Sequence, residues 1–301
     1  DTGAPVLMDL TDGCTVLVLD PDAAFHTLAG TPAQMIVEHT ERTGRAPAWP
    51  DWAYGVWMSR ATYLTAEEML GVVAELQAAD CPVDVIHVDA WMTGNVFRDF
   101  TTNWEVDRDR FPVGWTDRLR DSGARVSMWL NPFVHADTEL ADELHERGLL
   151  LRMPDGAPAT TCDRSYRNLV DFTNPAAVLW WQRQILDLVT AERPDALKLD
   201  FAEEVPPDAV THDGRPALVI RNSYATLYQQ ATVAALATLD GPAMPLFCRS
   251  GSAGAQVAPC HWVGDTPSTW EAMSGALSAC LSLSASGFAL VTHDGGDRKS
   301  V

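Results

Sequence analysis

The sequence predicts an α/β fold, a (β/α)8 barrel of the TIM type with about seven of its eight strands present. Short continuous apolar runs, which are typical of buried parallel strands, alternate with helical patterns from about residue 52 onward. Four of these runs end on an aspartate, at Asp89, Asp200, Asp265 and Asp294. Because the residues that follow barrel strands face the active-site mouth, we expect these four carboxylates to converge there.

The first 45 residues differ in pattern from the rest of the chain. Residues 14–19 (CTVLVL) form an expected strand, and residues 31–42 form an expected helix that begins after Thr31 as its cap. Residues 43–51 contain a glycine and two prolines, which are typical of a linker. The expected units are therefore residues 1–45 and the barrel, residues 46–301.

Strands and helices alternate within the second unit, as in consecutive βαβ units. The strands are expected at residues 54–58, 83–88, 125–130, 196–199, 245–248, 260–263 and 288–291. The helices are expected at residues 65–79, 138–147, 175–191, 222–239 and 268–283. Thr65 and Glu68 predict a capping box at the first of these helices. The long stretch from 131 to 174 is expected to make an excursion over the barrel mouth.

Composition limits the classes of function. The 301-residue chain is 47% hydrophobic, enough to bury a large core, and carries a net charge of −20. Since nucleic acids and anionic membranes bind basic surfaces, we expect neither as a partner. No run of about 18 uninterrupted apolar residues occurs, so no transmembrane helix is expected. The chain begins with Asp1, so we expect that the natural N-terminus is missing, and we expect a cytoplasmic location.

Two of the strand-end aspartates are candidates for catalysis. Lys198 lies two residues before Asp200, on the same face of a strand, and is its expected ion-pair partner. A purely structural Lys–Asp pair is the alternative. Asp265 follows Trp262, and an apolar wall raises the pKa of a carboxyl group, as a general acid requires. The alternative for Asp265 is a turn residue ahead of Pro267.

The aromatic residues favour a carbohydrate cleft. The chain has 11 tryptophans, and five of them lie at or just beyond expected strand ends: Trp57, Trp91, Trp104, Trp129 and Trp262. Aromatic faces can stack on sugar rings, although a place in the core is the more common role for any single tryptophan.

The sequence gives little support for a metal or a nucleotide cofactor. His87, His261 and His293 are the histidines nearest the expected strand ends, but no His-x-His pair is present on an early strand. The glycine-rich stretches around residues 251–254 and 295–296 lack the spacing of a phosphate-binding or dinucleotide-binding loop. We therefore expect no metal and no cofactor.

Several stretches together resemble glycoside hydrolase family 31, which contains retaining α-glucosidases and α-xylosidases. The stretches are YGVWMSR (54–60), PVDVIHVDAWM (82–92), NWEVDRDRFP (103–112), VSMWLNPF (126–133), KLDFAE (198–203), FCRSGSAGAQ (247–256), HWVGD (261–265) and THDGG (292–296). They occur in the family's order, and the resemblance covers about residues 35–296. It implies a barrel preceded by a β-sandwich domain, whose tail would be residues 1–45, and a chain that stops before the eighth strand.

The resemblance also assigns roles to residues. It implies that Asp200 is the nucleophile and Asp265 the general acid/base. The residues implied to bind the sugar are Asp89, Trp91, Trp129, Lys198, Glu203, Arg249, Trp262 and His293. Lys198 stands where α-glucosidases of the family commonly have a tryptophan, and this resembles the α-xylosidase-like branch. Ala202 stands where the family usually has a glycine.

The expected function is hydrolysis of terminal α-xylosyl or α-glucosyl residues with retention of configuration. The alternatives within the family are an α-glucosidase and a transglycosylase. The alternatives from other classes are a metal-dependent barrel hydrolase and an inactive barrel fragment that at most binds sugar. A carbohydrate is the expected partner, and a homo-oligomer of the full-length protein is left open.

Overall fold

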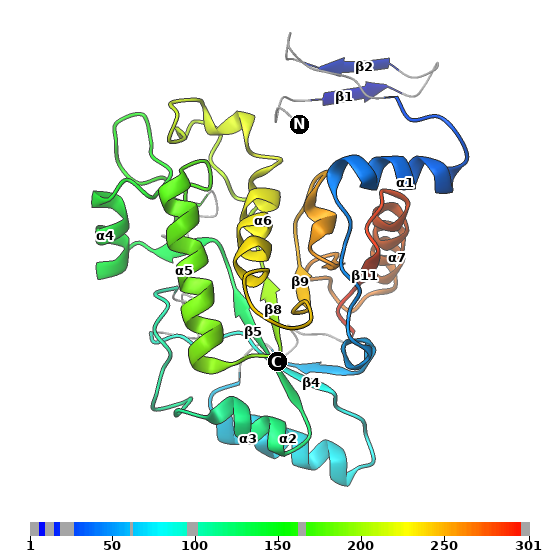
Figure 1. The fold of residues 1–301 in the computed structure, drawn as a ribbon, viewed down its shortest axis with the longest axis vertical. Helices are drawn as coiled ribbons and strands as arrows, with labels where there is room; N and C mark the ends of the chain where they lie inside the picture. Colours follow the sequence, from blue (N-terminus) through cyan, green and yellow to red (C-terminus); the bar gives the residue numbers. More distant parts are fainter. Residues whose placement is uncertain are drawn as a thin grey trace.

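The fold is organised around one parallel sheet (Figure 1). The computed structural model describes residues 27–60, 63–94, 102–161 and 167–295, together with the backbone of residues 6–9 and 15–18. Seven parallel strands lie in the order β11, β10, β9, β8, β5, β4, β3. Their bounds are β3 (Trp57–Ser59), β4 (Val85–Val88), β5 (Arg125–Leu130), β8 (Ala196–Leu199), β9 (Leu246–Cys248), β10 (Cys260–Trp262) and β11 (Leu290–Thr292). The prediction of a barrel-type parallel sheet with seven strands is therefore confirmed.

Side chains alternate between the two faces of this sheet, and both faces are buried. Ile86, Val126 and Leu197 are fully buried among the apolar residues of the hydrophobic core. The intervening residues face the concave interior, where Trp57 of β3 packs on Phe247 of β9 although these strands are not neighbours. The interior is therefore a separate layer of side chains beneath the ends of the strands.

Seven helices are described, and six of them overlap the helices predicted from the sequence. Their bounds are α1 (Pro32–Thr43), α2 (Ala66–Ala78), α3 (Trp115–Asp121), α4 (Glu139–Glu146), α5 (Pro175–Glu192), α6 (Tyr224–Leu236) and α7 (Trp270–Ala285). The sequence did not predict α3, which has seven residues. Among the described residues, no helix is long and apolar enough to cross a lipid bilayer.

The capping box predicted at α2 is only half formed. The Thr65 hydroxyl accepts the Glu68 N–H at 3.1 Å, as expected. The Glu68 carboxylate, however, accepts the Leu64 N–H and pairs with Arg60 instead of turning back to Thr65. The arginine supplies a charge-assisted partner that the cap itself does not offer, so the prediction was wrong for this half of the motif.

Two small antiparallel sheets accompany the barrel strands. β1 (Val6–Asp9) pairs with β2 (Thr15–Val18), and β2 lies within the strand predicted at 14–19. β6 (Phe133–His135) pairs with β7 (Arg167–Leu169) on either side of α4, inside the long crossover predicted between residues 131 and 174. The expected unit boundary at residue 45 stays a prediction.

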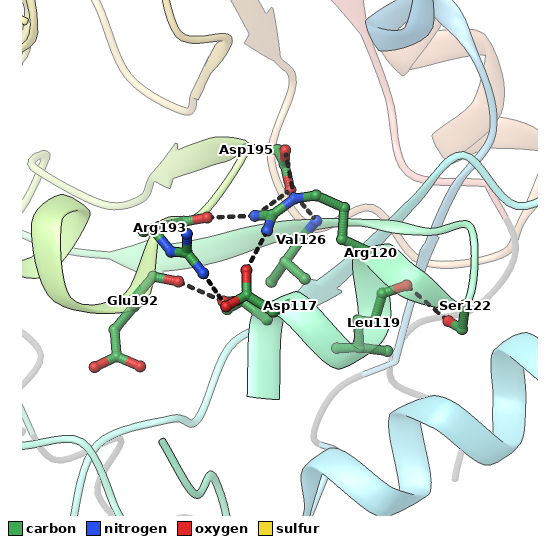
Figure 2. Close-up of polar contacts among 9 residues, drawn as sticks. Asp117, Leu119, Arg120, Ser122, Val126, Glu192, Arg193 and Asp195 are labelled. Carbon is green, nitrogen blue, oxygen red and sulfur yellow. Dashed lines mark hydrogen bonds and ion pairs between the residues drawn. The ribbon is translucent and has the colours of Figure 1, made fainter. Parts of the chain in front are cut away.

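A polar cluster closes the end of the sheet where β5 and β8 begin. Figure 2 shows it between α3, the end of α5 and the start of β5. Arg120 contacts Asp117 at 2.7 Å and Asp195 at 3.2 Å, and it donates 2.6 Å to the Arg193 carbonyl. Asp195 also accepts the Val126 N–H at 3.0 Å, while its own N–H donates to the Val126 carbonyl at 2.8 Å. This cluster ties two strands and two helices at the end opposite the strand-end aspartates.

We predict that Asp195→Ala lowers the free energy of unfolding by about 1–3 kcal/mol, because it removes the side-chain acceptor of the Val126 N–H and one of the acceptors of Arg120. Urea denaturation measures the change. Glu143→Ala is the matched control, since Glu143 forms an exposed pair with Arg147 one turn away on α4, and such pairs contribute about 0.3–0.5 kcal/mol. Equal losses in the two variants would contradict a structural role for the cluster.

Candidate active site

Asp200 is held by three groups at the carboxyl end of β8. It is 7% exposed. Trp129 of β5 donates its indole N–H to Oδ2 at 2.8 Å, and the Phe201 backbone N–H donates to Oδ1 at 2.8 Å. Arg249, just after β9, contacts Oδ1 at 3.3 Å. The sequence predicted Lys198 as the partner of Asp200, and this was wrong: Lys198 contacts Asp89 instead.

The chain turns sharply directly after Asp200. Phe201 and Ala202 both adopt the left-handed region, with φ values of 60° and 86°. This conformation is uncommon for residues other than glycine and costs of the order of 1–3 kcal/mol for each such residue. Ala202 is the position at which the resemblance expects glycine. The turn brings the Phe201 N–H onto the carboxylate and places its ring 5.0 Å from the Arg249 guanidinium.

Arg249 lies among three carboxylates. Besides Asp200, its Nε contacts Glu203 at 2.6 Å and its Nη1 lies 3.9 Å from Asp265. Burial alone would lower the pKa of the guanidinium, but the three neighbouring carboxylates outweigh burial and raise that pKa above its ordinary value. Arg249 therefore remains a fixed positive charge at the centre of the group.

The common contact to Arg249 limits the separation of the two expected catalytic carboxylates. Asp200 Oδ1 and Asp265 Oδ2 lie 3.3 and 3.9 Å from the same Nη1, so they are at most about 7 Å apart. Retaining glycosidases place their carboxyl groups about 5–5.5 Å apart, and inverting enzymes about 6.5–9.5 Å apart. A limit of about 7 Å between these two oxygen atoms is compatible with the retaining distance.

A depression of about 570 Å³ opens beside these carboxylates. Glu203, Arg249 and Asp265 line it together with Trp262 and residues of α7. The Asp265 side chain is 30% exposed, whereas that of Asp200 is 10% exposed. One carboxylate is thus accessible from the depression, and the other lies deeper under Arg249.

A second group of predicted residues forms a buried layer inside the barrel. Asp89 and Lys198 are 3% and 1% exposed, and the Lys198 Nζ lies 3.9 Å from Asp89 Oδ1. The same ammonium lies 4.5 Å above the ring of Trp262, which is fully buried. Asp89 also contacts His87, a residue that the sequence analysis considered only as a metal ligand.

The remaining predicted residues occupy different positions. Trp91 is fully buried, and its indole N–H donates a hydrogen bond of 2.7 Å to the Trp129 carbonyl. It therefore helps to fix the backbone of Trp129. His293 is exposed after β11, and its Nδ1–H donates to the Asp294 carbonyl. Within the described part of the chain, no contact joins His293 to Arg249. The described residues also hold no group of three His, Cys, Asp or Glu side chains placed to bind a metal ion.

His261 is buried without a partner for either ring nitrogen among the described residues. It lies on β10, is 1% exposed, and packs edge-on against Phe288 at 4.6 Å between ring centroids. Burial lowers the pKa of this imidazole from 6.5 to about 4. The ring is therefore neutral in the folded chain and is a packing residue of the strand that carries Trp262.

Comparison with known proteins identifies relatives of this chain. The model of the TIM-barrel domain of the glycosyl hydrolases of family 31 matches residues 46–297. An α-xylosidase of Emericella nidulans is 32% identical over 276 residues, which are 88% of this chain and 34% of that protein. α-Glucosidase 2 of Bacillus thermoamyloliquefaciens is 29% identical over 90% of this chain and 36% of its own length. The chain thus spans about a third of the length of these relatives.

Solved structures agree with these relationships. The crystal structure of a family 31 α-xylosidase from a soil metagenome, complexed with xylose, superposes with a TM-score of 0.80. It is 27% identical, and the match covers 90% of this chain and 40% of that one. A cycloalternan-degrading enzyme from Trueperella pyogenes superposes with a TM-score of 0.82 at 23% identity, which supports the fold alone.

We predict that His261 makes stability depend on pH between about 6.5 and 4. Above this window the ring is neutral in both states. As the pH falls through this window, the unfolded chain takes up a proton that the folded chain does not. The free energy of unfolding therefore decreases by about 3 kcal/mol. In urea titrations at several pH values, His261→Leu should lose this part of the slope. His145→Gln, a change at an exposed position of α4, should keep it. Parallel slopes for the wild type and His261→Leu would contradict the prediction.

Proposed function

The chain belongs to glycoside hydrolase family 31, and on that premise we propose that its barrel carries the catalytic centre of a retaining α-glycosidase. The substrate is a terminal, non-reducing α-xylosyl or α-glucosyl residue. The observation that carries the proposal is the contact of one arginine, Arg249, with both Asp200 and Asp265. It brings two carboxylates from different strand ends to one guanidinium, at a separation compatible with double displacement.

In the first step, an oxygen of Asp200 attacks the anomeric carbon while Asp265 donates its proton to the departing glycosidic oxygen. The carbon–oxygen bond to the leaving group breaks, and a covalent glycosyl–aspartate ester forms. Asp265, now a carboxylate, then removes a proton from water, and the hydroxide oxygen attacks the same carbon. The ester bond breaks, Asp200 is released, and the anomeric configuration is retained.

The contacts of the two aspartates support this division of roles. Trp129, Phe201 and Arg249 fix Asp200 as an acceptor-only group, and in this state it is ready to attack. Asp265 has the more exposed side chain and lines the depression, so water and leaving groups can reach it. In this scheme Arg249 offsets the negative charge that the two carboxylates bring together.

We favour an α-xylosyl substrate over an α-glucosyl one. Lys198 and Trp262 fill the barrel interior next to Asp89 and leave a fixed cation where the α-glucosidase version of the motif has an indole. The α-xylosidase of Emericella nidulans and the xylose-bound α-xylosidase structure support the same choice. The α-glucosidase relative supports an α-glucosyl substrate as the alternative. Transfer of the sugar to a second sugar in place of water is the other alternative.

The substrate choice is tested by nitrophenol release from aryl α-xyloside and aryl α-glucoside, measured side by side. We predict faster turnover of the xyloside and, by NMR, an α-anomer as the first sugar released. Faster turnover of the glucoside would favour the α-glucosidase alternative. Sugar binding by calorimetry without turnover would instead favour the inactive-barrel alternative, and loss of activity with a chelator would favour metal-dependent hydrolysis.

The assignment of roles is tested by Asp200→Ala and Asp265→Ala. Each variant should lower kcat on an unactivated glycoside by roughly 10²- to 10⁴-fold. With an activated aryl leaving group, azide should partly restore turnover in Asp265→Ala with retention of configuration, because the leaving group no longer needs a proton and azide attacks the glycosyl–aspartate ester without a base. Asp187→Ala, on the exposed face of α5, is the matched control. An unchanged rate in Asp200→Ala would refute the assignment.

A further inference from the structure

A continuous polar chain crosses the barrel interior beneath the candidate site. It runs from Ser127 on β5 through His87 on β4 to Asp89 at the end of β4, and from there to Lys198 on β8. All four residues are at most 3% exposed. The interior of such barrels is usually filled by bulky branched apolar residues. A buried chain of charged and polar groups is therefore a costly departure that needs a reason.

Strand register explains how these residues meet. His87 lies directly opposite Ser127 in the β4–β5 ladder, and Trp129 lies opposite Lys198 in the β5–β8 ladder. Two-residue spacing along β4 and β5 then puts Asp89 and Trp129 on the same interior face, one step nearer the carboxyl ends. The backbone thus lines up His87 beneath Asp89 in the same way that Ser127 lies beneath Trp129.

The atoms at each contact favour one tautomer of the neutral imidazole. His87 Nε2 lies 3.1 Å from Asp89 Oδ1, and Nδ1 lies 2.9 Å from the Ser127 hydroxyl. A carboxylate only accepts, so the proton of this hydrogen bond belongs to Nε2. The Ser127 hydroxyl can donate to Nδ1 and thereby fix the Nε2–H form, because a hydroxyl both donates and accepts.

We propose that His87 is a positioning residue for Asp89, held in its Nε2–H form by Ser127, and that it fixes the orientation in which Asp89 and Lys198 bind a sugar hydroxyl. This rests on the proposed function, since it takes a sugar to be the ligand of Asp89. With Oδ1 held by His87 and faced by Lys198, the direction of the carboxylate is set before the substrate arrives. A hydroxyl group can then accept from the ammonium and donate to the carboxylate.

The first test reads the contact itself and needs no activity. Long-range ¹H–¹⁵N NMR of histidine-labelled protein should show a protonated Nε2 for His87, identified by its loss in His87→Gln. Its proton signal should resist exchange, because the ring is buried, and it should shift in Asp89→Asn. A His87 ring protonated at Nδ1 with a bare Nε2 would overturn the proposal.

The second test separates positioning from folding. His87→Leu should lower kcat/KM for an aryl α-xyloside by roughly 10- to 100-fold, the effect of one hydrogen bond to a charged group. His87→Gln, whose amide can donate from a similar place, should recover most of the loss. A set of aryl α-xylosides, each lacking a different ring hydroxyl, then locates the effect. The xyloside that lacks the hydroxyl bound by Asp89 should be hydrolysed equally by the wild type and His87→Leu. Equal losses on all of them would refute the proposal.

The outcomes distinguish this proposal from the proposed function. If the wild type turns over no aryl glycoside, the proposed activity fails, while calorimetric binding of xylose to the wild type, His87→Leu and His87→Gln still compares the positioning. Absence of xylose binding by folded wild type would refute the positioning proposal as well. If His87→Leu does not fold, the NMR shift in Asp89→Asn and the xylose affinity of His87→Gln test the positioning proposal instead. A folded His87→Gln whose xylose affinity is below a tenth of that of the wild type would overturn the proposal.

Discussion

Buried charge is the constraint on which the arrangement of this barrel depends. Asp89, Lys198 and Asp200 are all at most 7% exposed, and a charge so deeply buried costs several kcal/mol unless partners compensate it. Each of the three has such partners: His87 and Lys198 contact Asp89, and Trp129 and Arg249 contact Asp200. Residues that are scattered over the sequence therefore have related physical roles, since each one satisfies a carboxylate at or just beyond the end of a strand.

The two ends of the sheet use charge for different purposes. Around Asp195 and Arg120, side chains bond to the backbone of neighbouring elements and fasten β5 to the start of β8 (Figure 2). Around Arg249, three carboxylates share one guanidinium, and two of them, Glu203 and Asp265, line the depression. The first arrangement uses up its hydrogen-bonding groups for stability, whereas the second keeps a carboxylate accessible for chemistry. This division agrees with barrels in general, whose active sites lie at the carboxyl ends of the strands.

The sequence predicted the parts of this structure that depend on local pattern. Continuous apolar runs marked β5 and β8 at the bounds that the structure has, and Thr31 and Asn174 cap the helices that were expected to follow them. It did not predict α3, β6 or β7, which are short elements inside the connections between barrel strands. The partner of Lys198 was mispredicted for another reason. Spacing along a strand gives the face of a side chain but not its neighbours across the barrel, and these depend on register between strands.

The turn after Asp200 shows how local strain and the site are linked. Two successive residues in the left-handed region are unfavourable, yet in this conformation the Phe201 ring packs against several side chains. The ring lies 4.7 Å from the Arg167 guanidinium and 5.0 Å from that of Arg249, and edge-on to Trp129. Trp129 and Arg249 are also the side chains that hold Asp200. The contacts that offset the strain are thus made in part by the same residues that orient the carboxylate. A glycine at position 202 would adopt this backbone more easily and would leave the Phe201 contacts in place.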